Sequence, residues 1–211
     1  MKFKERFSFF FFNKDKADFM FVQHMVASLN NAGRMAVVMP HGVLYRGGEE
    51  KKFREWLVGR GYLEAVIGMP SALFYGTGIG ACVLVINKAG AHERDHVLFI
   101  NADREYKEGK NQNKLRPEDL EKIAYTYRHK KETPKYSKLV AKSKAIDEHN
   151  NLENEDFNFN IRRFVDNAPS PEPQDVHAHL QGGIPKNEVK ALADYFNCYA
   201  GLEAKLFEPL K

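Results

Sequence analysis

Two short, continuous runs of apolar residues constrain the fold of this chain more than any other feature. They occupy residues 63–69 and 81–86, and a loop containing Phe74, Tyr75 and three glycines separates them. Unbroken apolar runs of this length are typical of strands that are buried on both faces of a sheet. Glycine adopts backbone conformations that other residues avoid and lets another molecule approach the main chain closely. The sequence therefore predicts two buried strands joined by a loop suited to close contact with a ligand.

The segments before the first run indicate a sheet covered by helices. Residues 18–31 carry apolar side chains at helical spacing, residues 34–40 form an apolar strand ended by proline, and residues 49–58 predict a second helix. This alternation favours an α/β fold in which the strands at 34–40 and 63–69 run in the same direction. The strand at 81–87 should run antiparallel, at an edge or inserted, because the loop before it is too short for a helical crossover.

Later segments extend this first domain, which we expect to end near residue 166. A short strand is expected at 97–101 and an amphipathic helix at 117–129. Residues 157–161 alternate apolar and polar side chains, as a further strand does.

The remainder of the chain differs in composition. Residues 167–175 contain three prolines and predict a stiff linker, and residues 176–211 follow it. Within this tail, residues 186–206 predict a last helix with one apolar stripe. An apolar stripe on a helix beyond a linker has to be covered, either by its own domain or by a partner.

Composition narrows the class of protein. A chain of 211 residues with 43% hydrophobic content buries one sizeable core, and a net charge of +4 permits nucleic-acid contact without requiring it. Cys82 and Cys198 lack Cys-x-x-Cys spacing and His177 with His179 lacks further ligands, so we expect reduced thiols and no metal site. The phenylalanine-rich residues 7–12 are too few for a membrane span or a signal peptide. We therefore expect a cytoplasmic protein with no membrane partner.

Several runs along the chain resemble the modification subunit of type I restriction-modification enzymes. In order, they are ADFMFVQHM (17–25), RMAVVMPHGV (34–43), RGG (46–48), EAVIGMP (64–70), LFYGTGI (73–79), NFNI (158–161) and GGIP (182–185). That family methylates the N6 amino group of adenine in DNA, using S-adenosylmethionine. The resemblance implies a partial Rossmann-like methyltransferase sheet, mostly parallel with one antiparallel strand, and a C-terminal helical tail.

The resemblance also shows what this chain does not contain. The glycine-rich cofactor loop and the Asn-Pro-Pro-Phe catalytic motif of the family should precede the helix at Asp18, and neither occurs in this sequence. Residues 1–166 would then be the C-terminal half of the catalytic domain, 167–175 a linker and 176–211 an assembly helix. No catalytic or cofactor-binding residue is assigned, and the chain alone is not expected to bind S-adenosylmethionine tightly or to methylate DNA.

The aromatic-glycine loop is the candidate pocket for the target base. Methylation at N6 requires the adenine to leave the duplex, which costs about a few kcal/mol, and to be held by stacking and hydrogen bonds. The resemblance implies that an aromatic side chain from a late loop covers one face of the base. Phe74 or Tyr75 is the candidate, with Gly76, Thr77 and Gly78 completing the wall. Alternatively, the two aromatic rings plug the end of the sheet and the glycines form an ordinary turn.

Two further groups of residues are candidates for the same region. Pro40, His41 and Gly42 lie at the carboxyl end of a strand, where open α/β sheets bind ligands, although a capping or surface position is the commoner explanation of a single histidine such as His41. Four cations are candidates for phosphate contacts, and a solvated helix face explains them as well, as it does Arg162 and Arg163. The four are Arg46, Lys51, Lys52 and Arg54.

The resemblance implies three partners: DNA, a specificity subunit and a restriction subunit of a type I complex. In such systems the specificity subunit reads the DNA sequence, and the stripe of the helix at 186–206 would pack against it or fold back on its own domain. The alternative function is a non-catalytic interaction module that docks on the specificity subunit.

Overall fold

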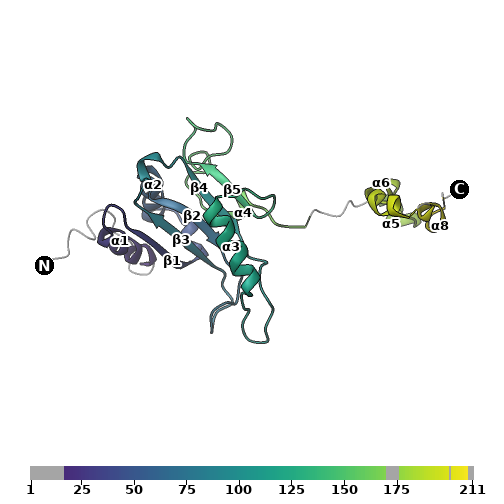
Figure 1. The fold of residues 1–211 in the computed structure, drawn as a ribbon, viewed down its shortest axis with the longest axis horizontal. Helices are drawn as coiled ribbons and strands as arrows, with labels where there is room; N and C mark the ends of the chain where they lie inside the picture. The colour runs from purple at the N-terminus through teal and green to yellow at the C-terminus, as the bar shows by residue number, and fades with distance from the viewer. Residues whose placement is uncertain (1–16, 170–175, 200, 209–211) are drawn as a thin grey trace. The chain divides into compact units, whose positions relative to one another are not determined.

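The computed structural model describes residues 17–169, 176–199 and 201–208, and it divides into two units, Met1–Ala168 and Pro169–Lys211. The first unit is an α/β domain built on one sheet (Figure 1). Its elements, in chain order, are α1 (Asp18–Ser28), β1 (Arg34–Pro40), the 3-10 helix η3 (His41–Leu44), α2 (Glu49–Gly59), β2 (Leu63–Gly68), β3 (Ala81–Asn87), the 3-10 helix η4 (Ala91–Glu93), β4 (His96–Asn101), α3 (Pro117–His129), β5 (Ser137–Ala141) and α4 (Ile161–Phe164).

The sheet has five strands in the order β1-β3-β2-β4-β5. β2 and β4 pair in parallel, whereas β3 lies antiparallel between β1 and β2. The α/β class is confirmed, and β3 is the inserted antiparallel strand that its short preceding loop predicted. The expectation of one antiparallel strand is corrected, because β5 also runs antiparallel, beside β4. β5 starts at the sheet edge where β4 ends, and the N–H of Asn101 donates to the C=O of Tyr136 across that point, at 2.8 Å.

Helices cover both faces of the sheet (Figure 1). On one face, Phe19 of α1, Phe53 of α2 and Phe164 of α4 belong to the larger apolar cluster. On the other face, Ile123 and Tyr127 of α3 pack against a second cluster that β2, β3 and β4 provide. β2 is therefore buried on both faces along its whole length, as its run of apolar residues, interrupted only by Glu64, predicted.

The outer edge of β5 is closed by hydrogen bonds within the domain. The N–H of Ser137 donates to the C=O of Thr133 and the N–H of Leu139 donates to Oε1 of Glu132, both at 2.9 Å. An edge strand whose polar groups are satisfied in this way does not offer a template for another strand.

The outer edge of β1 is open. The N–H of His41 donates to the C=O of Gly80 in register with the β1–β3 ladder, so the odd-numbered residues of β1 face β3. The backbone groups of Arg34, Ala36 and Val38 therefore point away from β3, and among the described residues none of them has a hydrogen-bond partner. Val38 is also 53% exposed. An apolar edge strand with unpaired backbone groups is suited to pairing with a further strand.

The second unit consists of short helices: α5 (Val176–Gln181), α6 (Lys186–Ala191), α7 (Ala193–Cys198) and α8 (Leu202–Leu206). The single helix predicted for residues 186–206 is thus wrong. Leu192 separates α6 from α7, and Gly201 adopts the left-handed conformation, with φ of 80°, just before α8. Residues 170–175 of the predicted linker lie outside the described residues, and the assembly role of the tail stays a prediction.

We expect Glu64 of β2 to make the unfolding free energy of the first unit depend on pH. Its carboxylate accepts hydrogen bonds from Tyr127 Oη at 2.9 Å and Asn87 Nδ2 at 3.1 Å, and Lys130 Nζ lies 3.4 Å away. Burial opposes ionisation, but these partners outweigh it and hold the pKa of Glu64 below its ordinary value of 4.5.

We expect Glu64→Gln to lower the unfolding free energy by about 1–2 kcal/mol at pH 7. A lowered folded-state pKa stabilises the fold above the unfolded-state pKa, and this contribution is lost as the pH falls through the folded-state value. The difference between the two proteins should therefore shrink below about pH 4. Urea titrations across this range measure it, and a difference that does not change with pH would contradict the prediction.

Candidate functional site

The carboxyl ends of β1, β2 and β4 meet at one edge of the sheet, because these three strands run in the same direction. Three connecting segments leave from this edge: η3, the loop 69–80 and the loop 102–116. Open α/β sheets bind their ligands beyond the carboxyl ends of the strands. The residues singled out in the loop 69–80 and in η3 therefore lie where a ligand is expected.

The two aromatic residues of the loop 69–80 face solvent. Tyr75 is 82% exposed and Phe74 is 46% exposed, so neither plugs the end of the sheet. Gly76 has φ of +76°, a conformation that side chains rarely adopt, and a Cβ there or at Gly78 would meet no neighbouring atom. Thr77 Oγ1 accepts the N–H of Ile79 at 3.1 Å, which shapes the turn. The loop thus presents aromatic surface beside open backbone.

Residues of the loop 102–116 hold this aromatic loop in place, and the sequence analysis did not identify them. Asn113 donates from Nδ2 to the C=O of Ser71 at 3.0 Å and from its backbone N–H to the C=O of Ala72 at 2.8 Å. Gln112 donates from Nε2 to the C=O of Leu73. These contacts connect segments about 40 residues apart, which no local sequence pattern indicates.

His41 joins η3 to the base of the aromatic loop. Its Nε2 lies 2.8 Å from the C=O of Ala81, and its ring packs against Gly80, where a Cβ would lie 3.1 Å from Cε1. Pro40 and Gly42 flank it, so the segment lies at the ligand edge as expected. Neither a capping nor a purely exposed position describes His41.

A cavity of about 140 Å³ opens beside His41 at this edge. The end of β4 supplies Asn101, which is buried and donates from Nδ2 to the C=O of Val165 at 2.9 Å. Asp103 Oδ2 accepts from Arg162 at 3.1 Å across the same cavity. The sequence signal for Asn101 and Asp103 is their position at the end of the apolar strand predicted at 97–101 and just after it.

The four candidate phosphate contacts have different surroundings. Arg54 is 1% exposed and donates to the C=O groups of Val43 and Phe157 at 2.9 and 2.8 Å, and burial lowers its pKa to about 10. It cannot reach a phosphate, and that prediction is wrong.

The other three cations each have an acidic partner. Arg46 lies 3.2 Å from Asp18 and 3.3 Å from Glu50, which joins α1 to α2. Lys51 pairs with Asp156 and Lys52 pairs with Glu49. Contact of these three with DNA stays a prediction.

No group of three or more metal-ligating side chains occurs among the described residues, and the side chains of His177 and His179 lie outside them. Within the described part of the chain, no helix is long and apolar enough to cross a membrane. The fold is an α/β domain, a class that typically binds ligands through loops at the carboxyl ends of the strands.

Comparison with known proteins identifies the family. Residues 1–172 match the model of the N-6 DNA Methylase family, and the chain belongs to this family. It is 32% identical over 161 residues to the type I restriction enzyme MpnII methylase subunit of Mycoplasma pneumoniae, covering 76% of this chain and 28% of the relative. It is 34% identical over 179 residues to the MjaVIII methylase subunit of Methanocaldococcus jannaschii, covering 83% and 29%.

A solved structure shows the same fold. The methyltransferase subunit of a type I restriction-modification system from Streptococcus thermophilus superposes with a TM-score of 0.69 at 36% identity, covering 78% of this chain and 34% of that one. The chain therefore spans less than a third of these two curated relatives and about a third of this structure.

Proposed function

We propose that this chain is the C-terminal part of a type I restriction-modification methyltransferase subunit, which transfers a methyl group from S-adenosylmethionine to adenine N6 in DNA. The chain supplies one wall of the target-base pocket and acts only with the segment that carries the glycine-rich loop and the Asn-Pro-Pro-Phe motif. DNA, the specificity subunit and the restriction subunit are its partners, in the cytoplasm.

The contrast between the two edges of the sheet carries this proposal. The outward N–H groups of Ser137 and Leu139 in β5 have acceptors within the domain, whereas Ala36 and Val38 of β1 leave their backbone groups unpaired among the described residues. A strand supplied by the rest of the subunit would pair with β1 and place its own carboxyl end beside η3 and the aromatic loop. S-adenosylmethionine supplies the methyl group when it is bound, and the residues of this chain stack on the base and exclude water.

Complementation tests the proposal. The chain is co-expressed with the N-terminal part of the Methanocaldococcus jannaschii relative, and N6-methyladenine in plasmid DNA is measured by mass spectrometry. We expect methylation only when both parts are present. Calorimetry on the chain alone should show no tight binding of S-adenosylmethionine. Tight one-to-one binding would overturn the division of roles.

The aromatic residues should govern the rate of the complemented pair. Stacking of a base on an aromatic side chain contributes about 1–3 kcal/mol, so the double variant Phe74→Ala with Tyr75→Ala should lower kcat/KM by about tenfold to a hundredfold. Tyr125→Ala, which removes an exposed ring of α3, is the matched control and should change the rate little. A double variant as active as the parent would remove the base-stacking role, and the single variants decide which ring stacks.

The second candidate function is a docking module formed by the C-terminal unit. Large apolar side chains are exposed there, including Leu180, Ile184, Tyr195 and Tyr199. Pull-down with the specificity subunit, with and without residues 176–211, separates the two functions. A chain that docks but never complements methylation would favour the module, and capture that survives the deletion would exclude it.

A further inference from the structure

Cations are concentrated in one segment of this chain. Residues 128–144 contain seven Lys or Arg residues and a single acidic residue, Glu132, whereas the whole chain carries a net charge of only +4. The rest of the chain is therefore net negative. We call these cations the basic strip: Arg128, Lys130, Lys131, Lys135, Lys138, Lys142 and Lys144.

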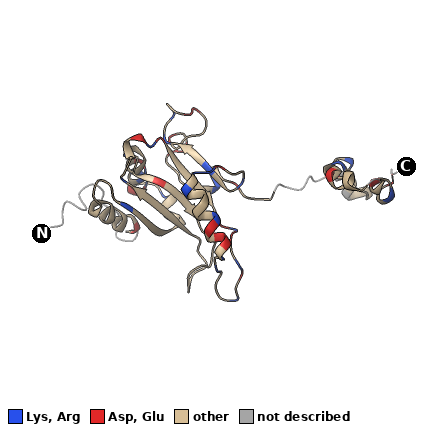
Figure 2. Ribbon diagram, viewed as in Figure 1, with Lys and Arg blue, Asp and Glu red and all other residues tan. Residues whose placement is uncertain are grey.

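The basic strip follows the closed edge of the sheet. It begins in the last turn of α3, passes through the turn before β5 and continues along β5. Figure 2 shows acidic residues at one end of α3 and basic residues near its other end and on β5. The five residues of β5 extend over about 17 Å, a length along which a DNA duplex carries about ten phosphate charges.

Part of this charge is not neutralised within the domain. Lys130 Nζ lies 3.4 Å from Glu64 and Lys142 Nζ lies 3.9 Å from Asp95. Three other cations of the strip make no ion pair or side-chain hydrogen bond within the described part of the chain: Arg128, Lys138 and Lys144. Arg128 and Lys144 are also exposed.

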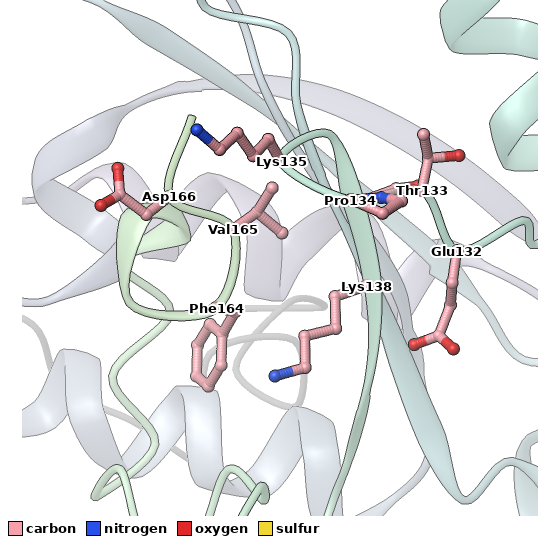
Figure 3. Close-up of a pocket in the computed structure, with 9 residues that line it drawn as sticks. Glu132, Thr133, Pro134, Lys135, Lys138, Phe164, Val165 and Asp166 are labelled. Atoms are coloured by element: carbon pink, nitrogen blue, oxygen red, sulfur yellow. The ribbon is translucent and has the colours of Figure 1, made fainter. Parts of the chain in front are cut away.

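A pocket of about 350 Å³ lies within the strip (Figure 3). Phe164 and Val165 form its apolar part, Lys138 extends its ammonium group toward Phe164, and Lys135 lies on the other side. This volume falls in the range of small-ligand sites.

The two carboxylates of the pocket are already occupied by backbone donors. Glu132 Oε1 accepts the N–H of Leu139, and Asp166 Oδ1 accepts the N–H of Ala168, each at 2.9 Å. Lys135 Nζ donates to the C=O of Ala168 at 3.3 Å, so Lys138 supplies the ammonium group that the pocket chiefly offers to a ligand. This group beside Phe164 and Val165 suits an anion that carries an apolar portion, such as a phosphodiester with its sugar.

We propose that the basic strip and this pocket bind the phosphate backbone of DNA, separately from the base pocket at the ligand edge. The inference rests on the proposed function for the identity of the polyanion. Such contacts fix the position of the duplex and carry no sequence information. The competing explanation is that lysines along an edge strand only prevent association between sheets.

Salt dependence of DNA binding tests the proposal. The full chain is titrated into short fluorescent duplexes of two unrelated sequences between about 50 and 200 mM salt. The double variant Lys135→Gln with Lys138→Gln should reduce the slope of log K against log salt by about 2, equally for both sequences. Lys190→Gln with Lys205→Gln removes the same charge from exposed positions in the other unit and should leave the slope unchanged.

Several results would overturn the proposal: no duplex binding, an unchanged slope in the double variant, an equal loss in the control, or equally tight binding of an acidic peptide polymer. Self-association of the double variant with unchanged DNA affinity would assign the lysines to edge protection instead. If the pocket variant misfolds, Arg128→Gln with Lys144→Gln, both at exposed positions, should reduce the slope in the same way. Failure of complementation would refute the proposed function, but the salt dependence of DNA binding could still be measured. Phe74→Ala, in the base pocket, should not change the slope of log K against log salt.

Discussion

Replacement of Arg54 by methionine is expected to lower the unfolding free energy of the first unit by about 3–4 kcal/mol. Methionine is shorter than arginine but has a similar volume, so the change removes the hydrogen bonds and the charge more than the packing volume. The C=O groups of Val43 and Phe157 would lose their donor, and each unsatisfied buried group costs about 1–3 kcal/mol. The guanidinium also lies 5.7 Å from the centre of the Phe159 ring, a contact worth about 1 kcal/mol.

Urea denaturation measures this effect, and the same helix provides its control. Arg60 follows α2 and is exposed, so Arg60→Met should change the unfolding free energy by less than about 0.5 kcal/mol. A loss below about 1 kcal/mol in Arg54→Met would contradict the prediction, because it would show that water satisfies the two carbonyl groups.

Arg54 also illustrates what the sequence could not predict. As one of several cations on a charged helix, it is indistinguishable by pattern from Lys51 and Lys52. Its burial depends on the C=O of Phe157, which lies 103 residues along the chain. Gln112 and Asn113 likewise contact the aromatic loop from about 40 residues away in the sequence. The sequence analysis therefore identified the loop but not the residues that hold it in place.

Local sequence patterns predicted where the strands lie better than they predicted how the strands are arranged in the sheet. The two apolar runs predicted β2 and β3 because burial on both faces leaves a nearly continuous run, and the short loop between them required an antiparallel turn. A brief strand was expected from residue 139, within β5, but its antiparallel direction was not predicted, because the helix and loop after β4 return the chain to the edge where it left.

Alternation misled the prediction at residues 157–161. A strand was expected, but Asn160 accepts the N–H of Arg162 with its side chain and begins the short helix α4. Phe159 packs near Phe99 from one side of this turn and Phe164 from the other. Alternation over only five residues is too short to specify a strand, and contacts with β4 decide the conformation here.

Substitution of Val38 by proline is expected to abolish most of the activity of the complemented methyltransferase without unfolding this chain. The N–H of Val38 points away from β3, so proline leaves the β1–β3 ladder intact while it removes a donor from the outer edge. A strand that pairs there would keep an unsatisfied C=O, at a cost of about 1–3 kcal/mol, and would meet the proline ring. Association of the two parts should weaken by about 10- to 100-fold.

Val38→Thr is the matched control, because threonine keeps both the N–H group and the β-branched shape of the side chain. It should complement methylation nearly as well as the parent chain. Hydrogen exchange provides a second measurement that does not depend on the folding of the proline variant. The amides of Ala36 and Val38 should exchange rapidly in the chain alone and become protected when the other part is added. Protection confined to other segments, with Val38→Pro still fully active, would show that the sheet is not continued across β1, and the proposed division of the subunit would fail with it.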